Sequence, residues 1–186
     1  MPQETLIEYL QHVLDAESNE WVLEKVSSRV KVAHFRDRPL AQSNTSITIG
    51  LSHYLLHLGG GEETRQELVL CAYSRFELQK LVTFLLLFSE FLIKEHDALR
   101  RGQVIFPPDR LLPESQMEAI YTTSPVRLGE CFASLEKPVK GIEFLGLLPL
   151  YASEVKYLRK FGSQQFGKLL DAEGENTLDL IRDPWT

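Results

Sequence analysis

The segment from Leu78 to His96 most constrains the fold of this chain, because it predicts a helix that is apolar on almost every side. One apolar stripe recurs at helical spacing, and a second group of side chains widens it nearly to the whole circumference. The stripe is Leu78, Leu81, Leu85, Phe88 and Leu92, and the widening residues are Val82, Phe84, Leu86 and Leu87. Ser74 and Glu77 have the spacing of a capping box. Such a helix is largely buried, so other elements must cover it.

Two strands are predicted directly before this helix. Residues Thr45–Tyr54 alternate between an apolar face and a small, polar face. The apolar face carries Ile47, Ile49, Leu51 and His53, and the polar face carries Ser46, Thr48, Gly50 and Ser52. Gly59–Glu63 indicates a mobile loop, because glycine reaches backbone angles that other residues avoid. Glu67–Tyr73 is then the returning strand, which makes an antiparallel pair.

Weaker patterns extend this pair to a mixed α/β chain. A capping box of Thr5 and Glu8 opens a helix that is expected to run to Ala16. Ser153 is expected to cap a helix that ends at Gly162, and a second short helix follows to Leu170. Further strands are expected at Val30–His34, Val104–Phe106, Met117–Thr122, Cys131–Leu135 and Ile142–Leu148.

Composition narrows the class of protein. The chain has 186 residues, of which 44% are hydrophobic, so one domain over 1–186 is expected. The net charge of -6 argues against a general nucleic-acid binder, which needs cations to neutralise phosphates. The most apolar run, Leu81–Phe88, is too short to span a membrane, and residues 1–4 do not resemble a signal peptide. A cytoplasmic location is expected.

The stretch 171–186 is acidic but not purely polar. It carries five carboxylates and a single arginine. It also carries apolar residues, namely Leu178, Leu180, Ile181 and Trp185. A disordered tail seldom has so many apolar side chains, so this segment is expected to pack back in part on the rest of the chain.

Patterns that would indicate catalysis or metal binding are weak. Cys71 and Cys131 are 60 positions apart in the sequence, and neither belongs to a CxxC pair. His53 and His57 are four apart, but they lack the glutamate of an HExxH motif. The chain also lacks a GxSxG elbow, and its triple glycine is followed by glutamates where a phosphate-binding loop has lysine. No catalytic residue, cofactor or metal is therefore predicted.

Four residues are candidates for binding a partner. Arg65 and Glu67 lie two apart on one face of a strand, where they form either an ion pair or part of a groove. Tyr151 and Glu154 follow the strongest late strand, and they belong either to a recognition surface or to the chemistry of a helix start. Together with the Gly59–Glu63 loop, they define the expected binding face.

The order and spacing of these segments resemble the Suppressor of fused domain family, from about Ser43 to Leu170. The resemblance rests on Ile47–Ser52, Glu67–Leu70, the helix Leu78–Phe91, Gly102–Ile105 and Ile142–Leu170. It implies an α+β fold, with a mainly antiparallel sheet and packed helices. Animal members sequester transcription factors through an extended peptide that adds to the sheet. This chain is more similar to the short bacterial members, which are commonly immunity proteins of toxin systems.

The resulting hypothesis is a non-catalytic interaction protein whose partner is a protein, with a toxin domain as the first candidate. An immunity role would act by occluding the toxin. The first alternative is a regulatory or scaffold protein that binds an endogenous peptide by strand addition. The second alternative is an enzyme. Neither nucleic acid nor a membrane is expected as a partner, and the oligomeric state is left open.

Overall fold

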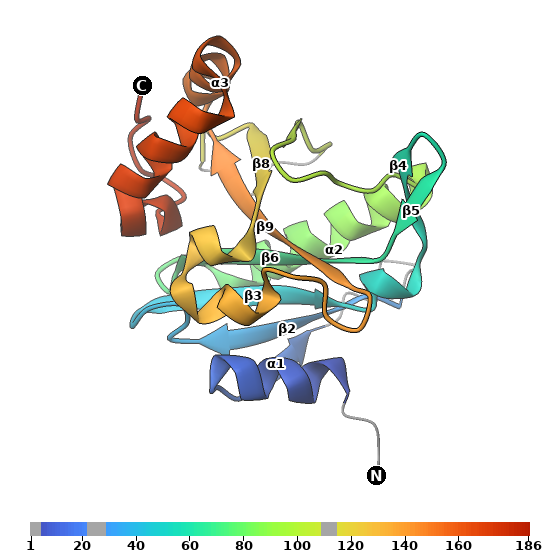
Figure 1. The fold of residues 1–186 in the computed structure, drawn as a ribbon. Coiled ribbons are helices and arrows are strands. Elements are labelled where there is room, and N and C mark those ends of the chain that lie inside the picture. The colour runs from blue at the N-terminus through green and yellow to red at the C-terminus, as the bar shows by residue number, and fades with distance from the viewer. Residues whose placement is uncertain (1–4, 22–28, 109–114) are drawn as a thin grey trace.

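The computed structural model describes residues 5–21, 29–108 and 115–186. Within these residues, seven strands form one sheet in the order β1-β2-β3-β6-β9-β8-β7 (Figure 1). Their bounds are Ser18–Trp21 for β1, Lys31–Arg36 for β2, Ser43–Ile49 for β3, Gln66–Tyr73 for β6, Val104–Ile105 for β7, Ala119–Thr123 for β8 and Glu143–Leu150 for β9. All neighbouring strands are antiparallel except β6 and β9, which are parallel. The predicted α+β class with a mainly antiparallel sheet is confirmed.

A hairpin and seven helical segments complete the described residues. The hairpin pairs β4 (Leu56–Gly59) with β5 (Glu62–Thr64). The α-helices are α1 (Leu6–Leu14), α2 (Leu78–Glu95) and α3 (Ala152–Glu173). The 3-10 helices are η1 (Leu51–His53), η2 (Pro125–Leu128), η3 (Glu130–Leu135) and η4 (Gly174–Leu178).

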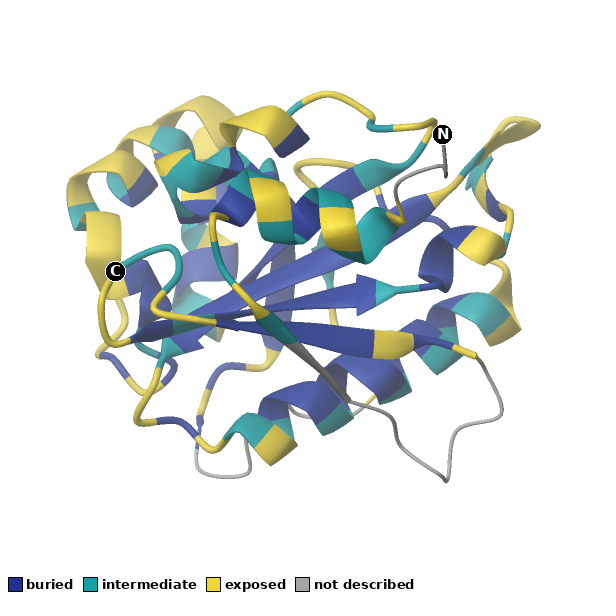
Figure 2. Ribbon diagram, turned by 90° about the horizontal axis from the view of Figure 1, so that it is seen from below, coloured by how far each residue is buried: buried dark blue, intermediate teal, exposed yellow. Residues whose placement is uncertain are grey.

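The long apolar helix is buried as predicted. Its inward side chains lie on one face of the sheet together with Leu68 and Leu70 of β6. Val69 and Cys71 alternate with them and pack on the opposite face with α1 and η3. Figure 2 shows the buried sheet between α1 and α2. The predicted capping box is wrong: Glu77 is the N-cap without a side-chain bond, and the Ser74 hydroxyl donates to the Gln42 carbonyl instead.

A third apolar cluster lies where α3 packs on β8 and β9. It includes Tyr121, Leu148, Val155 and Phe166, and the ring of Phe166 meets that of Tyr121 edge-on at 5.2 Å. The break that was expected at Gly162 is present, because this residue has φ of 80° and ψ of 169° inside α3.

Two further predictions differ from the structure. The predicted strand Thr45–Tyr54 ends at Ile49, because Gly50 has φ of 100° and turns the chain into η1. Cys131–Leu135 is not a strand but part of η3. Its two buried apolar residues, Phe132 and Leu135, are three positions apart, which matches the period of a 3-10 helix and not that of a strand. The strands β1, β4 and β5 had not been predicted, and the expected loop Gly59–Glu63 contains the turn of the β4–β5 hairpin.

The burial of α2 makes a stability prediction. Leu85 has no solvent exposure, so Leu85→Ala removes buried methyl groups and leaves a cavity. We expect a loss of about 2–5 kcal/mol of unfolding free energy, measured by denaturant titration. Leu87→Ala, at a partly exposed position on the same helix, serves as the control and should cost clearly less. An unchanged midpoint for Leu85→Ala would contradict its place in the core.

Candidate interaction site

Glu67 does not lie on the surface, which corrects the expectation drawn from the sequence. Its side chain is 0% exposed and accepts hydrogen bonds from one turn of the chain. The donors are the Thr48 hydroxyl at 2.6 Å, the Gly50 N–H at 2.8 Å, the Ser52 N–H at 3.1 Å and the Ser52 hydroxyl at 2.7 Å. The predicted polar face of β3 is therefore closed around a carboxylate and is not open to a partner.

The surroundings of Glu67 alter its protonation. Burial raises the pKa of this carboxyl from 4.5 to about 7, although the hydrogen bonds from Thr48, Ser52 and Gly50 oppose the rise. Arg65 is exposed and forms a second link to the same turn, because its Nη1 donates to the Ser52 carbonyl at 2.7 Å. These two residues thus hold η1 in place at the end of β3.

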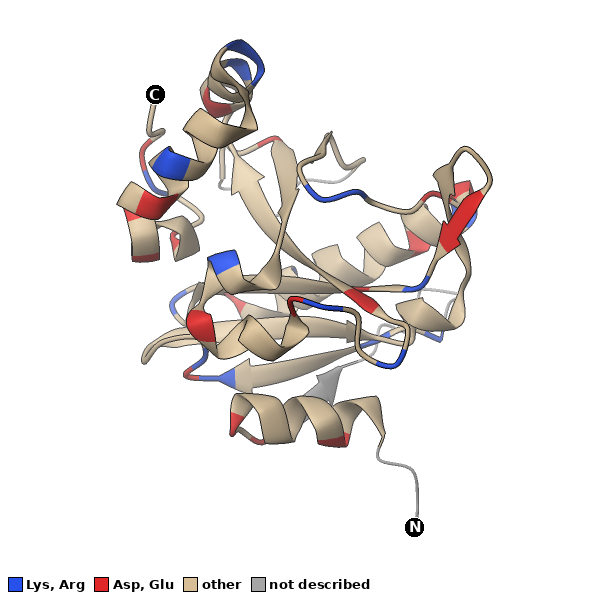
Figure 3. Ribbon diagram, in the orientation of Figure 1, with Lys and Arg blue, Asp and Glu red and all other residues tan. Residues whose placement is uncertain are grey.

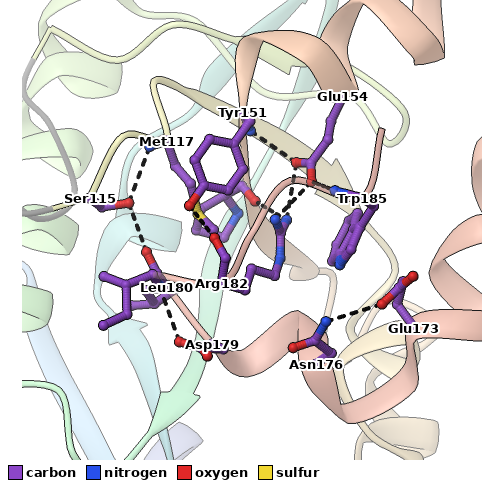
Figure 4. A network of polar contacts seen from close by, with 12 residues as sticks. Ser115, Met117, Tyr151, Glu154, Glu173, Asn176, Asp179, Leu180, Arg182 and Trp185 are labelled. Carbon is purple, nitrogen blue, oxygen red and sulfur yellow. Dashed lines mark hydrogen bonds and ion pairs between the residues drawn. The ribbon is translucent and has the colours of Figure 1, made fainter.

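Glu154 is also buried, and its partner is Arg182. Arg182 Nη1 lies 2.7 Å from Glu154 Oε1, and Nη2 lies 3.1 Å from Oε2. The side chains are 1% and 0% exposed (Figure 4). The same carboxylate accepts the Tyr151 N–H at 2.9 Å and the Trp185 N–H at 3.1 Å. Glu154, and not the expected Ser153, therefore satisfies the backbone at the start of α3.

Two aromatic residues complete this network. The Tyr151 hydroxyl donates to the Arg182 carbonyl, and the Arg182 guanidinium lies 3.4 Å from the centroid of the Trp185 ring. Arg182 was not among the predicted site residues. The one signal in the sequence was that a single arginine stands among five carboxylates in 171–186.

The four predicted residues do not form one face. Glu67 is paired with Phe144 across β6 and β9, whereas Tyr151 lies seven positions beyond Phe144. An extended strand of that length spans about 23 Å. Arg65 and Glu67 thus lie at one end of the sheet, and Tyr151 and Glu154 lie at the other.

An accessible groove lies beside the edge strand β7. It has a volume of about 340 Å³ and is lined by β4, the end of α2, the following loop and β7. The residues are His57, Leu58, Gly59, Phe91, Leu92, Asp97, Ala98, Leu99, Arg100, Gln103 and Ile105. Phe106, directly after β7, is 52% exposed. The groove therefore adjoins the glycine-rich loop that had been expected to take part in binding.

Buried polar contacts hold the groove in place. The Gln66 side chain donates to the Leu99 carbonyl at 2.7 Å and accepts the Leu99 N–H at 2.9 Å. The His57 carbonyl accepts the Ala98 N–H at 2.9 Å, and Arg100 donates to the Leu58 carbonyl. The hairpin is thereby attached to the loop that follows α2.

The described residues contain no group of three His, Cys, Asp or Glu side chains placed to hold a metal ion. Burial raises the pKa of the Cys71 thiol to about 12, which makes it a poor nucleophile. In the same part of the chain, no helix is both long and apolar enough to cross a membrane.

The raised pKa of Glu67 predicts a pH dependence of stability. Between pH 4.5 and about 7, the folded state binds more protons than the unfolded state, so stability falls as pH rises through this window. The free energy of unfolding of the wild type, measured by denaturant titration, should therefore fall relative to that of Glu67→Gln between pH 5 and pH 8, by an amount on the order of 3 kcal/mol. Glu62→Gln, at an exposed position, should leave the slope unchanged. A slope of opposite sign would show that the four donors hold this pKa below 4.5.

The buried ion pair makes a second prediction. Arg182→Met leaves the Glu154 carboxylate buried without its cation and should cost about 3–5 kcal/mol in a denaturant titration. The double variant Arg182→Met with Glu154→Leu should recover part of that loss, because it removes both charges. A single variant as stable as the wild type would contradict a structural role for the pair.

Comparisons with known proteins show which family and which solved structures this chain is similar to. A family model described as Suppressor of fused protein matches residues 27–183. No curated protein matches the chain. A crystal structure described as a Suppressor of fused homologue from Neisseria gonorrhoeae FA 1090 has a TM-score of 0.70 at 17% identity, and the match covers 96% of this chain and 93% of that one.

Two further solved structures share the fold. A chain of a crystal structure described as the Sufu–Fu complex has a TM-score of 0.65 at 11% identity, and the match covers 97% of this chain and 90% of that one. Drosophila Suppressor of Fused has a TM-score of 0.67 at 11% identity, and the match covers 97% of this chain but only 50% of that one. The family match extends over most of the sequence, so this chain belongs to the Suppressor of fused family.

Proposed function

We propose that this chain is a non-catalytic, cytoplasmic protein-binding domain, and that it neutralises a cognate toxin by occluding it. Membership of the Suppressor of fused family supports a binding role, since one solved structure with this fold is a complex of Sufu with Fu. A net charge of -6 favours encounter with a basic partner. The immunity role follows the resemblance to short bacterial members.

The observation that carries this proposal is the position of β7 at one edge of the sheet, where no strand among the described residues pairs with its outer side. An edge strand presents unpaired N–H and C=O groups, to which an extended peptide can add. Here the edge adjoins a groove of mixed polarity, whose apolar lining includes Phe91, Leu92 and Ile105, and the exposed Phe106 directly follows β7. The two buried carboxylates, in contrast, are committed to contacts within the fold.

Gene neighbourhood distinguishes the immunity role from a regulatory or scaffold role. A toxin gene next to it favours immunity, whereas an isolated gene favours a regulatory or scaffold protein that binds an endogenous peptide at the same edge. An enzyme would require a cleft with convergent titratable groups of perturbed pKa. The pKa of Glu67 has the largest upward shift among the described carboxylates, but this side chain is completely buried, so it cannot line an open cleft.

A growth assay tests the role and the face together. Cells that express the toxin encoded beside this gene should survive when they also carry the wild type. Phe106→Asp should abolish this protection, because it puts a charge beside the open edge. Phe161→Asp, at a position 47% exposed on α3, is the matched control and should still protect. Both changes should shift stability by less than about 0.5 kcal/mol.

The growth assay tests the immunity role and the binding face separately. Failure of the wild type to protect would refute the immunity role. Full protection by Phe106→Asp would show that the toxin is occluded by a different face.

A further inference from the structure

A second cleft lies between η2 and the carboxyl end of α3, on the other side of the molecule from the β4–β5 hairpin. It has a volume of about 600 Å³. Its apolar lining comes from three segments that are far apart in the sequence: Leu40, then Val126 and Leu128, and then Leu170 and Leu178. The cleft therefore offers an apolar floor to a side chain from outside.

The rim of this cleft is acidic on both walls. Glu130 stands at the start of η3, and Asp171 and Glu175 stand at the end of α3 and in η4; all three are exposed. Figure 3 shows red segments on η3 and near the carboxyl end of α3. The last turn of α3 carries Asp171 and Glu173 and no basic residue, although the carboxyl end of a helix favours cations. The acidic side chains of the rim and the carboxyl end of α3 thus both contribute to a negative potential at this cleft.

Within the described part of the chain, Arg127 is the only basic residue that lines the cleft. It spans the two walls, because its guanidinium pairs with Asp171 and donates to the Gly167 carbonyl at 3.3 Å. The paired side chains are 40% and 64% exposed, and exposed pairs contribute only about 0–1 kcal/mol. A cation from a partner can therefore replace Arg127 at Asp171 at little cost.

We propose that this cleft receives a segment of a protein partner in which an apolar side chain is flanked by lysine or arginine. The apolar side chain enters between Leu128, Leu170 and Leu178, and the flanking cations meet the acidic rim. This surface is distinct from the β7 edge, so its existence does not depend on the immunity role or on the partner at that edge.

The test uses a fluorescein-labelled, capped pentapeptide with one leucine between two lysines on each side. Two matched peptides replace the lysines with glutamates or the leucine with glycine. The wild type should bind the first peptide and should bind each matched peptide at least about tenfold more weakly by fluorescence anisotropy. Binding should also weaken as salt is raised.

A pair of charge reversals locates the site. Glu130→Lys with Glu175→Lys should reduce affinity by at least about tenfold without a change in melting temperature. Glu62→Lys with Glu95→Lys changes the net charge equally at exposed positions near the hairpin and should have a much smaller effect. Equal losses in both double variants, or equal binding of the glycine peptide, would overturn the proposal.

The other possible occupant is a second copy of the chain. α3 bears an exposed basic ridge of Lys156, Arg159 and Lys160 beside the exposed Phe161. If this ridge fills the cleft, the wild type will sediment as a dimer and Phe161→Asp will sediment as a monomer. That result would overturn the proposal of a partner segment, whereas a monomeric wild type that binds the lysine peptide would support it.

Discussion

The ion pair between Glu154 and Arg182 is the contact on which the closure of the fold depends. Both side chains are almost completely shielded from solvent, so each charge needs the other. By fixing Arg182, the pair holds the segment that contributes to all three apolar clusters. Leu180 packs with α2, Leu178 packs with α1 and η3, and Trp185 packs against the α3 cluster. The buried ion pair therefore anchors the segment that connects the three apolar clusters.

In this chain, two buried carboxylates fix the local course of the backbone. Glu67 accepts backbone N–H groups from the turn that ends β3, and Glu154 accepts those of Tyr151 at the start of α3 and of Trp185. Each satisfies N–H groups that regular pairing leaves free. The two surfaces proposed for partners, the β7 edge and the acidic cleft, do not include these carboxylates.

Local patterns predicted most of the elements, and contacts between distant residues explain what was missed. The apolar period of α2, the alternation in β3 and the Leu- and Val-rich run of β6 were sufficient to predict these elements, because burial follows directly from such patterns. Charged side chains are almost never fully buried unless they are paired, so Glu67 and Glu154 were expected on the surface. Nothing near Glu154 in the sequence indicates Arg182, which is 28 positions away. The acidic cleft likewise joins residues from Leu40 to Leu178, and no local pattern could predict it.

The parallel pairing at the centre of the sheet also determines the order of events during synthesis. Gln66 of β6 and Glu143 of β9 are neighbours in the sheet but are 77 positions apart in the chain. At about 5–20 residues per second, a ribosome needs roughly 4–15 s to make that interval. Throughout that time one edge of β6 has no neighbour, and the strands from β1 to β6 cannot complete the sheet. The nascent chain is therefore exposed to edge-to-edge association until β9 emerges, which makes this interval the natural point for a chaperone to act.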